Sequence, residues 1–222
     1  MCALKTRLLI VVSSLFLFFL LLTYPSNYSS LLPVFKVTEN PTVISQGTYG
    51  NTLTIDLTFG REDVQELINN LETPYPQFFI SIEWIERSEE IIELMNKKKI
   101  PIGLLGKEGI TYIEDKGLFD REVERFEKAI GKKPLWFRTI DYEFPYELQK
   151  QAWAHEINSL GSSKYWLEEF PKLEKGDIIT VPLHQQERVD IKELSKILQT
   201  TDFVTIEQNI FELKVKTKSY PN

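Results

Sequence analysis

Few side chains in this chain could carry acid–base, nucleophilic or metal chemistry. The 222 residues include two histidines, His155 and His184, and one cysteine, Cys2. Asp56 lies in an alternating run (TLTIDLTF, 52–59), where a polar group near the end of a strand is expected. A Ser-His-Asp arrangement around His184 stays open, although the sequence has no Gly-x-Ser-x-Gly turn to expose a serine.

Paired carboxylates could serve glycoside hydrolysis, in which one acts as acid and the other as base or nucleophile. Asp141 with Glu143, and Glu83 with Glu86, are such pairs. Exposed carboxylates are common, so these pairs alone do not indicate an active site. The glycines of the segment GLLG (103–106) are too sparse to form a phosphate-binding loop.

Aromatic side chains offer another kind of chemistry, which is the stacking of sugar rings. Trp84, Tyr142 and Trp166 are the candidates for substrate binding, and Trp136 and Trp153 lie in similar positions. All are at or near predicted strand ends or on predicted helices. The alternative is that most of these rings pack in the core.

The N-terminus predicts a membrane anchor. Residues 8–24 contain no charged residue, and a stretch of roughly 17–20 residues just crosses a bilayer. Lys5 and Arg7 precede it and no acid appears before Glu39, so the remainder should be extracytoplasmic. We therefore expect a cytoplasmic tail (1–7), a transmembrane anchor (8–24), a stalk (25–50) and a domain (51–217) in a single-pass cell-membrane protein. A cleaved signal peptide is the rival interpretation, but no small-x-small pair follows the apolar run.

Charge and cysteine content exclude two further classes. The net charge of −6 becomes more negative once Lys5 and Arg7 are set aside, and no basic stripe suits nucleic acid. Cys2 precedes the predicted anchor, so no disulfide can form within the domain.

The predicted domain alternates short apolar runs with amphipathic segments. This order predicts parallel strands covered by helices, and periodicity alone leaves open whether the sheet is open or closed into a barrel. Gly131 should end one helix, and Asp190 with Glu193 should cap another. Strands are expected at 52–59, 78–82, 100–105, 135–138, 177–181 and 202–206, and helices at 62–71, 88–95, 120–130, 147–156 and 190–198.

The order of these segments resembles the NodB-type polysaccharide deacetylases, which have the carbohydrate esterase family 4 fold. LTIDL (53–57) stands where that family has TFDDG, and FFISIEW (78–84) is similar to TFFVTGEW. IPIG (100–103) resembles HEIG. The segment FEKAIGKKPLWFR (126–138) is similar to the family's helix, turn and strand that end in FRPPYG. KGDII (175–179) resembles PGDII, and residues 202–211 resemble the closing FVTLSEL segment. The resemblance implies a distorted (β/α)7-type barrel.

In that family a divalent metal, held by one Asp and two His, lowers the pKa of its bound water to about 7. A second Asp is the base, an Arg orients it, and a late His protonates the leaving amine. The resemblance implies Asp56, Arg138 and His184 as remnants of this base, orienting Arg and acid. At the metal-ligand positions stand Leu57, Leu105 and Gly109, which cannot bind a metal.

We therefore expect no metal, no cofactor and no working metal-dependent deacetylase. The ordinary alternatives are that Asp56 is a strand-end polar group, that Arg138 forms a structural ion pair with it, and that His184 is a loop residue. His155, next to Glu156, should lie on a helix surface.

Three functions follow from this interpretation. The first is a catalytically degenerate, membrane-anchored protein with the deacetylase fold that binds cell-wall polysaccharide. The second is an active carbohydrate deacetylase with a rearranged site built on Asp56, Arg138 and His184. The third is a scaffold for a membrane or cell-wall enzyme, in which the acidic surface meets a protein partner.

Overall fold

A computed structural model describes residues 36–60, 62–185 and 189–211. The predicted cytoplasmic tail and transmembrane anchor lie outside the described residues. Within the described ranges, no helix has the length and apolarity needed to cross a membrane.

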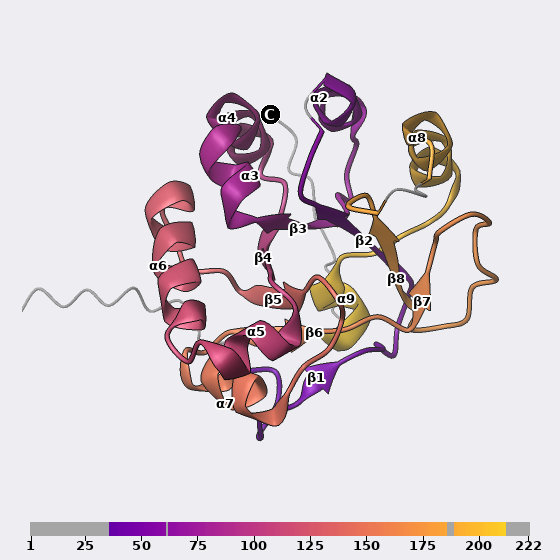
Figure 1. The fold of residues 1–222 in the computed structure, drawn as a ribbon. Coiled ribbons are helices and arrows are strands. Elements are labelled where there is room, and N and C mark those ends of the chain that lie inside the picture. Colours follow the sequence, from indigo (N-terminus) through magenta and orange to yellow (C-terminus); the bar gives the residue numbers. More distant parts are fainter. Residues whose placement is uncertain (1–35, 61, 186–188, 212–222) are drawn as a thin grey trace, which may run out of the picture. The chain divides into compact units, whose positions relative to one another are not determined.

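The described strands form one parallel sheet with the order β1-β6-β5-β4-β3-β2-β8-β7 (Figure 1). In these residues the end strands β1 and β7 are not paired with each other, so the sheet is a curled half-barrel. The expected parallel strands covered by helices are confirmed, but closure into a (β/α)7 barrel is not seen among the described strands. The strands are β1 (Val43–Ile44), β2 (Thr52–Leu57), β3 (Gln77–Ser81), β4 (Ile102–Gly106), β5 (Trp136–Thr139), β6 (Asn158–Leu160), β7 (Lys164–Tyr165) and β8 (Ile178–Pro182).

Helices follow most strands and bury their apolar faces against the sheet (Figure 1). The backbone after one helix takes a left-handed conformation at Gly131, where φ is +82° and no side chain is strained. The side chain of Asp190 caps another by accepting the N–H of Lys192. The helices are α2 (Glu62–Asn70), α3 (Ile82–Arg87), α4 (Glu89–Lys98), α5 (Gly109–Glu114), α6 (Leu118–Ile130), α7 (Tyr146–Ala154), α8 (Ile191–Thr200) and α9 (Ile206–Phe211).

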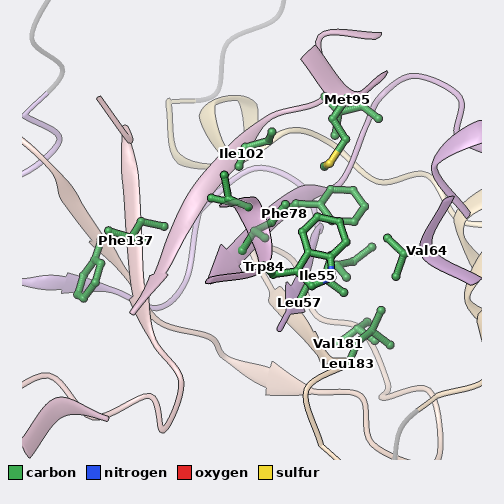
Figure 2. Close-up of a cluster of buried hydrophobic side chains, with 14 of the residues drawn as sticks. Ile55, Leu57, Val64, Phe78, Trp84, Met95, Ile102, Phe137, Val181 and Leu183 are labelled. Carbon is green, nitrogen blue, oxygen red and sulfur yellow. The ribbon is translucent and has the colours of Figure 1, made fainter. Parts of the chain in front are cut away.

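The two faces of the sheet carry different side chains. On β2, Leu53, Ile55 and Leu57 enter the large hydrophobic cluster, while Thr54 and Asp56 face the other way, as the period of a strand requires. Figure 2 shows this large cluster around β2, β3 and α4, with the ring of Trp84 among the aliphatic side chains. A smaller cluster covers part of the opposite, concave face; it consists of Phe79, Leu105, Trp136, Leu160, Ile178 and Ile206.

Most predicted elements are confirmed with shifted ends, and one is wrong. Residues 202–206 are not a strand. A single backbone hydrogen bond, from Val204 N–H to Asn51 O, joins them to the residue before β2. Ile206 instead begins α9 and packs on the concave face. The helix expected to begin at Asp120 begins at Leu118, with Gly117 at its N-cap. Strand β1 comes from the segment predicted as a stalk.

Candidate functional site

A buried ion pair lies at the centre of the concave face. Asp56 on β2 and Arg138 on β5 are separated by β3 and β4 in the sheet, yet the curl brings Arg138 Nη1 within 2.9 Å of Asp56 Oδ1. Both side chains have 0 % exposure. The guanidinium carbon lies 4.3 Å from the ring centroid of Phe79, which comes from the intervening strand β3.

Arg138 has its donors engaged by the protein itself. Nε donates to Leu160 O at 3.0 Å and Nη2 to Gly161 O at 2.9 Å, so the end of β6 holds one side of the guanidinium. Nη1 also lies within hydrogen-bond distance of Thr54 Oγ1 and Thr180 Oγ1. A buried ion pair pays a large desolvation cost, and hydrogen bonds of this kind offset it.

Tyr142 closes the other side of Asp56. Its hydroxyl donates to Asp56 Oδ2 at 2.8 Å, so both carboxylate oxygens are hydrogen-bonded. Burial, and next the charge of Asp56, raise the pKa of Tyr142 well above its usual range, so the phenol remains a donor. The backbone of Tyr142 is left-handed (φ +62°), a conformation that costs a bulky residue about 1–3 kcal/mol.

His184 lies beside this cluster, in the turn after β8. Its ring centroid is 6.3 Å from that of Tyr142. Burial lowers the pKa of His184; the charge of Asp56 opposes that shift and the charge of Arg138 adds to it. The imidazole is therefore neutral at pH 7. Its Nδ1 is buried and has no hydrogen-bond partner among the described residues.

Tyr165 on β7 adds an aromatic surface that the sequence did not indicate. Its ring centroid is 4.8 Å from that of Tyr142, in an edge-to-face arrangement, and the residue is 42 % exposed. A two-residue strand gives no periodic signal, so nothing in the sequence marked Tyr165. Tyr142, Tyr165 and His184 together form an aromatic rim over the Asp56–Arg138 pair.

No protein-family model and no curated protein matches this sequence. Solved structures do. PdaA from Bacillus subtilis, a family 4 carbohydrate esterase, is 16 % identical over 78 % of this chain and 86 % of its own, with a TM-score of 0.63. A family 4 pseudoenzyme from Bacillus anthracis is 16 % identical over 77 % of this chain and 69 % of its own, with a TM-score of 0.64. A mutant of that pseudoenzyme with restored enzymatic activity is 17 % identical over 77 % and 71 %, with the same TM-score.

The chain has the polysaccharide deacetylase fold. Identities this low show the fold and leave the activity to the residues of the site.

The residues at the ligand positions of the deacetylase fold do not fit a metal. Leu57 is fully buried in the large cluster, Leu105 packs in the small cluster, and Gly109 has no side chain. In the part of the chain that the structure describes, no three His, Cys, Asp or Glu side chains are grouped to hold an ion. Asp56, at the neighbouring base position, is not free either, because its carboxylate accepts hydrogen bonds from Arg138 and Tyr142.

Two predicted stacking residues are corrected by their burial. Trp84 has no exposed ring face and donates its indole N–H to Gly60 O at 2.8 Å. Trp166 is also fully buried and packs edge-to-face on Phe170. Both rings are large enough to fill the core, so neither presents a face to a sugar. Of the three aromatic candidates, Tyr142 alone lies at the polar centre.

The remaining candidates have structural contacts. His155, expected on a helix surface, is the residue just after α7, and its Nε2 lies 2.8 Å from Asp120 Oδ1. Arg125 pairs with Glu86 at 2.7 Å and lies 3.8 Å from Glu83, and all three are well exposed. Asp141 accepts backbone N–H groups and so holds a turn.

Proposed function

We propose that this chain is a membrane-tethered, extracytoplasmic protein of the deacetylase fold that binds cell-wall glycan without hydrolysing it. The observation that carries the proposal is the enclosure of Asp56. A general base needs a free lone pair within hydrogen-bond reach of the water that it activates. Both oxygens of Asp56 already accept a hydrogen bond from a protein group, and the residue has no exposed surface, so water does not reach the remaining lone pairs.

The residues that the structure describes contain no metal-ligand set, which supports the same conclusion. Free water has a pKa of about 15.7, and a bound metal lowers it to about 7. One enclosed carboxylate cannot supply that change. His184, whose pKa is lowered by burial, lies beside this site, and the described residues contain no group of His, Cys, Asp and Glu side chains that could hold a metal to activate water.

Glycan binding is supported by the rim over the ion pair. Tyr165 and the neighbouring Leu167 are each 42 % exposed, and an exposed tyrosine offers both a flat apolar face and a hydroxyl to a sugar. Carbohydrate esterases share the fold.

The test is co-sedimentation of the full chain, purified in detergent, with insoluble peptidoglycan and with chitin. We expect binding to at least one, and Tyr165→Ala should weaken it by about tenfold, the size of an interface residue worth more than 1 kcal/mol. The control is Tyr146→Ala, because Tyr146 is more exposed and contacts Lys150 rather than Tyr142. No binding to either polymer, or equal loss in both variants, would refute glycan binding and favour the protein-scaffold alternative.

The tether has a separate test. The full chain should fractionate with membranes and resist extraction by high salt, whereas a chain that starts at Pro25 should be soluble. Equal solubility of the two chains would contradict the anchor, and a shortened N-terminus on the full chain would indicate signal cleavage.

A further inference from the structure

The turn that carries Tyr142 packs directly against Gly109, at the start of α5. The Gly109 N–H lies 3.1 and 3.0 Å from the two carboxylate oxygens of Asp141. A Cβ at position 109 would overlap Glu143 O and come within 2.8 Å of Pro145 Cδ. The absence of a side chain at Gly109 is therefore what lets residues 141–145 approach this closely.

The same turn is tied internally in the conformation that points Tyr142 inward. Asp141 Oδ1 also accepts the N–H of Glu143 at 3.1 Å. Thr139 Oγ1 donates to Glu143 O at 2.9 Å, and the Tyr142 N–H donates to Thr139 O at 3.2 Å. These bonds hold Tyr142 in its left-handed conformation, with its hydroxyl on Asp56.

We propose that residues 139–145 form a plug, seated on Gly109, that shuts the Asp56–Arg138 centre away from solvent and ligands. With the plug seated, the polar centre of the concave face is closed to solvent. Any side chain at position 109, including the histidine that the deacetylase resemblance places there, requires the plug to leave its seat. Unseating it exposes Asp56 while β2 and β5 keep the ion pair in place.

The test compares Gly109→Ala with the wild-type full chain by hydrogen–deuterium exchange and by carbodiimide-coupled amidation of Asp56 with glycinamide. Gly109 has no left-handed φ, so alanine there costs little besides the overlap with the plug. We expect exchange in residues 139–145 to rise by about tenfold or more, because the local opening is made easier. Asp56 should be amidated in Gly109→Ala and unmodified in the wild type.

Gly50→Ala is the matched control, since its Cβ would come within 2.7 Å of a Val204 methyl group, away from the plug. It should leave both readouts unchanged. Asp141→Ala is the second variant: it removes the carboxylate that binds the Gly109 N–H, and it should unseat the plug even if Gly109→Ala does not fold.

A folded Gly109→Ala or Asp141→Ala protein with a protected plug and unmodified Asp56 overturns the inference. Faster exchange spread evenly over β2 to β5 also overturns it, because the whole sheet has then been loosened. Neither result decides glycan binding, which is measured separately with Tyr165→Ala; Tyr142 is the residue that the plug and the rim share.

Discussion

At the scale of single residues, the polar centre is a charge cluster whose members depend on one another. Arg138 and Asp56 have no exposed surface, so either charge left alone would be buried without compensation. The sequence left open an ordinary ion pair between these two residues as the alternative to a catalytic role, and the structure shows that ion pair. The hydrogen bond from Tyr142 to Asp56 could not be predicted from the sequence. It depends on a left-handed backbone at Tyr142, and no residue pattern predicts that conformation for a tyrosine.

Arg138→Met should therefore lower the free energy of unfolding by about 3–5 kcal/mol, measured by urea denaturation. The double variant Asp56→Asn/Arg138→Met should recover part of that loss, because it also removes the negative charge of Asp56, which the single variant leaves buried without its partner. Lys107→Met is the control: its ion pair with Glu83 is 2.8 Å long but well exposed, and should contribute less than about 1 kcal/mol. A loss of similar size in Arg138→Met and Lys107→Met would contradict a buried, interdependent cluster.

A second buried charge lies on α6. Glu122 is almost fully buried and accepts a hydrogen bond from Tyr112, whose hydroxyl also accepts the N–H of Lys107. Burial raises the pKa of Glu122 from 4.5 to about 6, although the hydrogen bond from Tyr112 acts in the opposite direction. The folded protein thus binds this proton more tightly than the unfolded chain does.

The sign of the pH effect follows from that difference. Between about pH 4.5 and 6 the folded state binds more protons, so stability falls as pH rises, by up to about 2 kcal/mol at pH 7. Relative to Glu122→Gln, which has no charge to bury, the wild type should gain stability when the pH is lowered from 7 to 5. Urea denaturation at the two pH values measures the effect. A stability difference that does not change with pH would show that Glu122 keeps an ordinary pKa.

At the scale of elements, β3 and β4 separate β2 from β5 and set the distance that the ion pair must cross. Gly103 on β4 makes room for the ring of Phe79, on which the guanidinium of Arg138 lies. Helices and central strands have enough periodic residues to be predicted from the sequence. The segment 202–206 was mistaken for a strand because short β-branched runs carry no information on whether a partner strand is available.

Gly103→Ala should destabilise the protein by about 1–3 kcal/mol, because its methyl group would lie 2.8 Å from Trp136 O and 2.9 Å from the Phe79 ring. Gly161→Ala is the control, with its nearest contact at 3.3 Å from a Val43 methyl group, and should cost less. Equal midpoints of urea denaturation for the two variants would show that the contact between Gly103 and the Phe79 ring, on which Arg138 lies, is not tightly packed.

At the scale of the whole molecule, the strand order brings together residues that lie far apart in sequence. Strands β2 and β8 are neighbours, which places Thr54 and Thr180 on the same face as Arg138. Strand–helix alternation predicts parallel pairing but contains no signal for strand order or for closure of the sheet. Strands β1, β6 and β7 have two or three residues each, too few for a pattern, so the rim around Tyr165 could not be predicted.

We propose that this chain, although it has the deacetylase fold, does not act as a metal-dependent deacetylase. The most direct measurement combines metal content with acetate release, on the full chain in detergent after incubation with zinc and with peptidoglycan or chitin oligomers. We predict less than stoichiometric metal and no acetate above the protein-free blank. Stoichiometric zinc together with acetate release that is lost in Asp56→Asn would contradict the account, since the enclosed carboxylate would then be a working base.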